Sequence, residues 1–156
     1  MSTDVKINRG LKNIYFERSG VSHIDGAKGE LSYRGYSLHD LATKSTFEEV
    51  SYLLIYGELP TPPQLAEFDH KLKAARQLPP AVYEIIKAAS AGHPMDVLRT
   101  AVSSLAALEP DSQKVSEEDF VENGIRLTSQ VPMIIAAHEN IRKGRQPIAA
   151  DPTLSH

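Results

Sequence analysis

The chain has 156 residues, of which 41% are hydrophobic and 24% are charged, with a formal net charge of −3. This length suffices for one domain with a substantial core, and the charge gives no electrostatic reason to expect nucleic acid or an anionic membrane as a partner. The absence of cysteine excludes disulfides, thiolate nucleophiles and cysteine metal sites, and it fits a reducing compartment.

Two segments bear on membrane insertion and targeting. The apolar stretch over residues 131–137 is far shorter than the roughly 20 residues that span a bilayer. Residues 1–13 lack the apolar core of a secretory signal. We therefore expect a cytoplasmic protein that has no membrane partner.

The N-terminal part of the chain has a composition typical of short β-strands. Residues 14–16 and 21–24 include β-branched and aromatic side chains, and Leu31 and Tyr33 alternate with polar neighbours. Residues 25–29, Asp-Gly-Ala-Lys-Gly, have the turn chemistry that joins two antiparallel strands. These segments predict a small β-hairpin.

Beyond residue 36 the sequence predicts successive helices separated by glycine and proline. Apolar residues recur at spacings of three and four, and the expected helix ends lie at Gly57, Gly92, Pro110 and Gly144. The expected helix starts have the spacing of a capping box at Ser37 with Asp40, Ser45 with Glu48, Thr61 with Gln64, and Ser116 with Asp119. The predicted fold class is mainly α, with a small N-terminal β-hairpin.

The last two predicted helices, near residues 95–108 and 117–143, differ from the others. The first is rich in alanine and serine, which allow close approach of helix backbones, and the second would be about 40 Å long. Pro132 lies inside the second helix and predicts a kink there. Long helices with apolar stripes are buried between layers or between subunits. The pattern by itself slightly favours a monomeric bundle over a subunit interface.

Six histidines are the main candidates for chemistry: His23, His39, His70, His93, His138 and His156. No two of them have metal-ligand spacing, and the sequence contains no H-E-x-x-H, G-x-S-x-G, Walker or G-x-G-x-x-G motif. We interpret Asp25, near His23, as a turn aspartate and expect His93, which precedes a proline, to bond to backbone.

Two further histidines are each followed by an acidic residue on a predicted helix. We interpret His39 with Asp40 and His138 with Glu139 as surface polar residues, because adjacent residues on a helix point in different directions. These arguments alone predict a helical domain without an assignable activity.

Several segments, in chain order, resemble the citrate synthase family. The run Ile24 to Tyr36 is similar to the family's I-D-G-x-x-G-x-L-x-Y-R-G-Y signature, within a longer match over residues 22–42. Residues 47–60 resemble the next helix and its G-x-L-P exit. His93-Pro94-Met95 matches an H-P-M element before a helix, and residues 130–133 resemble the interior of a long proline-containing helix.

The resemblance implies a multi-helical enzyme that condenses acetyl-CoA with oxaloacetate to give citrate and CoA. In the family an aspartate removes a proton from the thioester methyl, histidines stabilise the enol and polarise the ketone, and arginines hold the carboxylates. No metal is implied, and acetyl-CoA acts as a substrate rather than a cofactor.

The family's histidine motifs, H-x-[DE]-H, G-P-L-H-G and G-x-x-H-R, do not occur in this sequence. The run His138-Glu139-Asn140 is superficially similar to the first motif, but the resemblance aligns it with a structural segment. We therefore expect no catalytic, cofactor-binding or metal-binding residue in this chain, and no condensing activity from the chain alone.

The resemblance also implies a domain organisation and an oligomer. We expect residues 1–36 to form an N-terminal segment with the hairpin, and residues 37–156 to form the N-terminal part of the helical large domain, without the small domain. Residues 151–156 resemble a connection, so we expect a partial chain.

For the oligomer, the resemblance shifts the expectation from a monomeric bundle to a homo-oligomer built from dimers through the helices near 95–108 and 117–143. Two alternatives stay open: a segment of a 2-methylcitrate synthase, and a non-catalytic oligomerisation module derived from the family.

Overall fold

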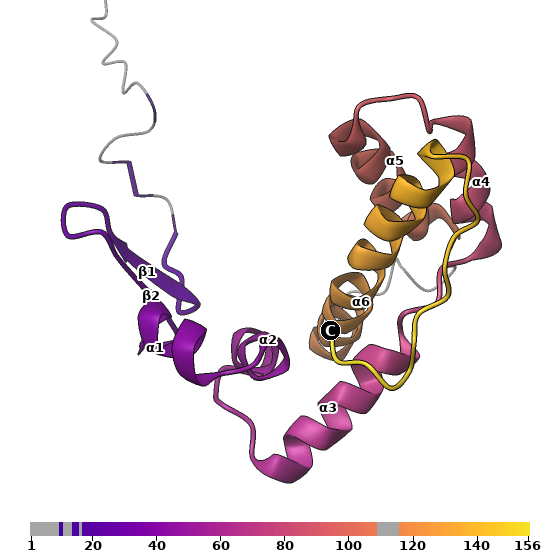
Figure 1. The fold of residues 1–156 in the computed structure, drawn as a ribbon. Coiled ribbons are helices and arrows are strands. Elements are labelled where there is room, and N and C mark those ends of the chain that lie inside the picture. Colours follow the sequence, from indigo (N-terminus) through magenta and orange to yellow (C-terminus); the bar gives the residue numbers. More distant parts are fainter. Residues whose placement is uncertain (1–9, 11–13, 16, 109–115) are drawn as a thin grey trace, which may run out of the picture. The chain divides into compact units, whose positions relative to one another are not determined.

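The structure, a computed structural model, describes residue 10 and residues 14–15, 17–108 and 116–156 (Figure 1). Contacts group the chain into two compact units, Met1–Ser45 and Thr46–His156. The helix that follows the hairpin thus belongs to the first unit by its contacts, whereas the expected boundary of the family's large domain after residue 36 stays a prediction.

The first unit contains a three-stranded antiparallel sheet. Strand β1 (Ser22–Asp25) pairs with β2 (Glu30–Tyr33), and β2 pairs with β3 (Tyr36–Ser37). The Asp25 carboxylate accepts hydrogen bonds from the backbone N–H groups of Ala27 and Lys28, each at 3.1 Å, which makes it the expected turn aspartate. The predicted hairpin is confirmed, and the sheet contains one strand more than predicted.

The additional strand begins after a two-residue turn at Arg34-Gly35. Both residues have positive φ, 48° and 88°, as a type I′ hairpin turn requires. Glycine takes this conformation without steric cost, so Gly35 supplies the local signal for the turn. The prediction of a strand at residues 14–16 is wrong for Ile14 and Tyr15, which are exposed and have irregular backbone; Phe16 lies outside the described residues.

Helix α1 (Leu38–Lys44) follows β3 directly. Its N-cap is the predicted Ser37, whose hydroxyl oxygen accepts from the backbone N–H of His39 at 3.2 Å. Asp40 bonds to Lys44 at 2.6 Å, one turn further along.

Helix α2 (Phe47–Tyr56) begins one residue later than the predicted start. Its capping box consists of Thr46 and Glu49, not of Ser45 and Glu48. Ser45 instead ends α1, and the buried Glu48 carboxylate accepts a hydrogen bond from a distant segment. The helix ends at Gly57, which has the expected left-handed conformation with φ of 94°.

Four more helices follow among the described residues: α3 (Pro62–Ala74), α4 (Pro80–Ala88), α5 (Pro94–Leu108) and α6 (Glu117–Arg142). At α6, Ser116 and Asp119 form the predicted reciprocal capping box, with N–H to side-chain distances of 3.0 and 3.1 Å. At α3, the Gln64 carbonyl accepts from the backbone N–H of Thr61 at 2.8 Å. The predicted stop at Pro110 lies outside the described residues.

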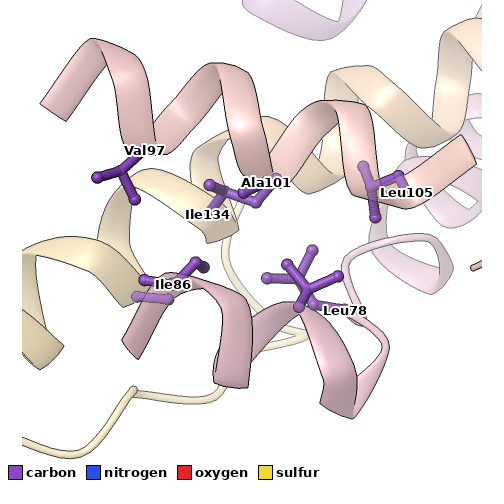
Figure 2. Close-up of a cluster of buried hydrophobic side chains, with 8 residues drawn as sticks. Leu78, Ile86, Val97, Ala101, Leu105 and Ile134 are labelled. Atoms are coloured by element: carbon purple, nitrogen blue, oxygen red, sulfur yellow. The ribbon is translucent and has the colours of Figure 1, made fainter. Parts of the chain in front are cut away.

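Two apolar clusters hold the second unit together. In the larger one, one face of α5 points at residues from α4, α6 and the loop before α4, as Figure 2 shows for Val97, Ala101 and Leu105 of α5 against Leu78, Ile86 and Ile134. The smaller cluster joins α2, α3 and the first half of α6 through Tyr52, Phe68, Leu72 and Ile125. Helix α6 therefore contributes to both clusters.

The chain after α6 reverses direction and runs back along the second unit to His156 (Figure 1). Helix α6 stays helical on both sides of Pro132, and the kink stays a prediction. Across the part of the chain that the structure describes, no helix combines the length and the apolar character needed to cross a membrane.

Candidate functional site

The histidines lie on different elements and have different surroundings. His23, His39 and His70 are exposed, on β1, α1 and α3. His93 lies just before α5, where its Nδ1 accepts from the backbone N–H of Met95 at 3.3 Å, so the expected backbone role is confirmed. In the described ranges, no group of three histidine, aspartate, glutamate or cysteine side chains is placed to bind a metal ion.

The expectation that His138 lies on the surface is wrong. Its side chain is on the face of α6 that packs into the unit, and the residue is only 6% exposed. The Nε2 atom lies 3.3 Å from the carbonyl oxygen of Ser90, at the end of α4. A proton on Nε2 would make this contact a hydrogen bond that joins α6 to the end of α4, and the buried ring has little exposed surface for a substrate.

The last histidine, His156, lies at the end of the returning segment. Its ring stacks on Phe47 of α2 with 4.4 Å between ring centroids and an interplanar angle of 8°. Its backbone N–H donates to the Glu48 carboxylate at 2.7 Å. Burial and the positive charge of Arg76 lower the pKa of His156, and the charge of Glu48 partly opposes this effect.

Arg76, just beyond the end of α3, contacts the same segment. The residue is 9% exposed, and its Nη1 donates to the carbonyl oxygens of Asp151 and Leu154, both at 3.0 Å. No motif in the sequence predicted Arg76, because its partners are 75 and 78 residues away. This contact holds the backbone of residues 151–154 in place and offers no reactive group.

An open groove of about 780 Å³ lies between the C-terminal ends of α2 and α3 and the first half of α6. Its lining includes apolar side chains such as Val121 and Ile125, with Lys71 and Glu122 among the charged residues. Lys71 forms an ion pair with Glu67, which raises the pKa of the ammonium through hydrogen bonding. The lining residues include no nucleophile held by a base, so they do not form a catalytic constellation.

One buried polar group in this groove has unused hydrogen-bonding capacity. Gln130 of α6 donates from Nε2 to the carbonyl oxygen of Gln77 at 2.9 Å. Its Oε1 atom is buried and has no hydrogen-bond partner among the described residues.

Helix α6 has a second apolar stripe that its own unit does not cover. Phe120, Leu127 and Ile135 are exposed large apolar residues at spacings of seven and eight, so they lie on one face of the helix. Ile135 is 53% exposed, whereas its neighbour Ile134 is completely buried. The unit therefore presents an apolar helix face in addition to its core-facing one.

Comparison with known proteins relates this arrangement to one family. A family model described as "Citrate synthase, C-terminal domain" matches residues 10–156. The citrate synthase of Acidithiobacillus ferridurans is 42% identical over an alignment of 153 residues that covers 94% of this chain and 40% of that protein. The 2-methylcitrate synthase 2 of Corynebacterium glutamicum is 36% identical over 155 residues, which are 99% of this chain and 40% of that protein.

Solved structures give the same result for the fold. The citrate synthase from Pyrobaculum aerophilum superposes with a TM-score of 0.89 at 35% identity, over 96% of this chain and 40% of its own. That of Thermotoga maritima has a TM-score of 0.82 at 35% identity, over 96% of this chain and 39% of its own. The chain thus spans about 40% of the length of these relatives. Because the family model and the relatives match nearly all of the 156 residues, the chain belongs to the citrate synthase family.

Proposed function

We propose that this chain is part of an enzyme that condenses acetyl-CoA with oxaloacetate to give citrate and CoA, and that its own share of the enzyme is structural. In this reaction the methyl carbon of the thioester forms a bond to the ketone carbon of oxaloacetate, and water then cleaves the thioester to release CoA. The match to the citrate synthase family over residues 10–156 carries the proposal.

The surroundings of the histidines support a structural rather than a catalytic role for this chain within the enzyme. His138 and His93 are engaged with backbone groups, and His156 stacks on an aromatic ring. General acid–base chemistry needs an imidazole or carboxylate within reach of the substrate proton, together with a group that orients it. The contacts described for these three histidines bind or pack against other parts of the chain instead.

We further propose that α5 and α6 form the interface of a homodimer. The uncovered stripe of Phe120, Leu127 and Ile135 supports this, since a contiguous apolar face on a protein surface marks an interaction site. An isologous dimer would bury this face of α6 against the same face of a second copy. The cysteine-free composition supports a cytoplasmic, reducing location for the enzyme.

Complementation tests the function. The chain is co-expressed with the part of the A. ferridurans citrate synthase that has no counterpart in it, and CoA release from acetyl-CoA and oxaloacetate is followed with a thiol reagent. We expect activity from the pair and none from either polypeptide alone. Robust CoA release by the 156-residue chain alone would refute the structural share, and an inactive but correctly assembled pair would refute the proposed reaction.

A 2-methylcitrate synthase is the second candidate, because such enzymes are among the relatives at 36% identity. Propionyl-CoA differs from acetyl-CoA by one methylene, and a hydrophobic pocket discriminates such substrates by about 10- to 200-fold. Assays of the native gene product with both thioesters decide between them through kcat/KM. A native product that dimerises but releases CoA from neither thioester would favour the third reading, an oligomerisation module.

A further inference from the structure

The returning segment, residues 151–156, is held at two points by side chains from distant parts of the sequence. At the first point a single nitrogen of Arg76, Nη1, bridges the carbonyl oxygens of Asp151 and Leu154. At the second point the Glu48 carboxylate accepts the backbone N–H of His156, and the His156 ring covers Phe47. We call these contacts the two-point clamp.

Both clamp residues are charged and nearly buried, which is costly unless hydrogen bonds compensate. Arg76 is 9% exposed and Glu48 is 8% exposed. A guanidinium that donates to two carbonyls and a carboxylate that accepts a backbone N–H form charge-assisted bonds, which are about twice as strong as neutral ones. These bonds offset part of the cost of burying the two charges when residues 151–156 lie in this position, whereas Nη2 of Arg76 is buried without a hydrogen-bond partner among the described residues.

The segment is also shaped locally to fit the clamp. The Asp151 carboxylate accepts from the N–H of Thr153 at 2.8 Å and from its hydroxyl at 2.6 Å, which forms a tight turn. This turn directs the carbonyl oxygens of Asp151 and Leu154 toward the same donor on Arg76. The clamp therefore fixes the path of the backbone from Asp151 to Leu154 as well as its point of contact.

We propose that Arg76 and Glu48 are positioning residues, which hold residues 151–156 on the helical unit and thereby set the place and direction from which an enzyme of this family continues toward its catalytic part. The consequence for catalysis rests on the proposed function and on the expected N-terminal placement of this chain in the enzyme. The clamp itself is tested without any activity measurement.

The charges that face His156 supply a readout that a loss of packing alone would not reproduce. Arg76 lowers the pKa of His156 and Glu48 raises it, alongside the lowering effect of burial. Removal of Glu48's charge by Glu48→Gln leaves an amide oxygen that still accepts the N–H, so the pKa of His156 should fall further. Removal of Arg76's charge by Arg76→Met should raise the pKa, both directly and by exposing the ring.

Hydrogen exchange followed by mass spectrometry on the full chain measures both effects. Backbone exchange reports whether the N–H of His156 stays bound to Glu48, which requires the segment to keep its position, and imidazole C2 exchange reports the pKa of a single histidine. With Arg76→Met we expect exchange in residues 151–156 to be about 10- to 100-fold faster, as expected for the loss of a charged hydrogen bond. Arg76→Lys, which keeps the charge and a donor, should recover part of the protection. The matched control is Arg99→Met, since Arg99 is an exposed arginine on α5 that pairs with Asp96, three residues away on the same helix, at 3.0 Å.

The outcomes separate the clamp from the proposed function. Unchanged exchange in Arg76→Met, or pKa shifts of His156 with the same sign in Arg76→Met and Glu48→Gln, would overturn the clamp whatever the activity. In the complemented pair, Arg76→Met should reduce CoA release while assembly persists. Full activity in that variant would overturn the positioning role, whereas a wild-type pair without activity would overturn only the proposed function.

Discussion

Two neighbouring isoleucines on α6 allow the same substitution to test two different faces of one helix. Ile134 is completely buried in the larger cluster, whereas Ile135 is 53% exposed on the uncovered stripe. Replacing either by alanine removes the same atoms from the same helix. Any difference between the two variants therefore reports tertiary surroundings and not helix propensity.

The magnitudes follow from burial. Ile134→Ala removes buried methyl and methylene groups and leaves a cavity, which lowers the free energy of unfolding by about 2–5 kcal/mol. The better helix propensity of alanine offsets a few tenths of a kcal/mol of this loss. That loss is large against the 5–15 kcal/mol that is typical of whole domains, and it would lower the Tm by about 5–15 °C. Ile135→Ala should change the stability of the monomer by less than about 0.5 kcal/mol.

Urea unfolding followed by circular dichroism, at several protein concentrations, measures both effects, and analytical ultracentrifugation measures self-association. Ile134→Ala should lose stability at every concentration. Ile135→Ala should instead weaken self-association, so its apparent stability should differ from wild type only at concentrations where wild type is dimeric. Equal, concentration-independent losses in both variants would refute the two-faced description of α6.

Three further predictions concern single residues. Gly57→Ala should lower the free energy of unfolding by about 1 kcal/mol or more, because a side chain is strained at the φ of 94° at the end of α2. Gly124→Ala, inside α6, should instead stabilise the monomer by about 0.5–1 kcal/mol. Thermal unfolding of the two variants should therefore show Tm shifts of opposite sign. Ser116→Ala should cost about 0.5–2 kcal/mol through loss of the α6 cap, measurable by urea unfolding, and an effect smaller than that of an exposed serine elsewhere would contradict the capping role. The Thr153 hydroxyl and N–H lower the pKa of Asp151 in the folded chain, so this carboxylate stabilises the fold above about pH 4 and the benefit is lost as the pH falls through the lowered value. Asp151→Asn should therefore flatten the acid limb of a stability-versus-pH curve, and an unchanged limb would argue against the turn.

The caps and ends of the helices were predictable because the hydrogen bonds that form them join residues within one helical turn of each other. The Ser116–Asp119 box and the left-handed Gly57 involve residues at most four positions apart, so the residue types alone determine them. The start of α2 shows the limit of such signals. Ser45 and Thr46 each stand three residues before a glutamate. The helix begins after Thr46, which forms the reciprocal box with Glu49, while Ser45 ends α1 and Glu48 accepts the distant N–H of His156.

Burial of single polar residues was not predictable from the pattern. His39 and His138 are both helix residues followed by an acidic neighbour, yet the first is exposed and the second is buried beneath the end of α4. The difference is set by which helix lies opposite, and no local spacing encodes that. The third strand, in contrast, had a local signal in the Arg34-Gly35 turn.

The sequence by itself determined the family, through motifs spread in order along the chain, and most of the helices, through apolar periodicity and end signals. Only the tertiary structure decided that Arg76 and Glu48 meet the segment at 151–156, since the loop between partners 75 or more residues apart is closed by packing of the whole helical unit. It also decided that α6 has one apolar face in the core and other apolar residues left uncovered, because the positions of the neighbouring helices select the face that is buried.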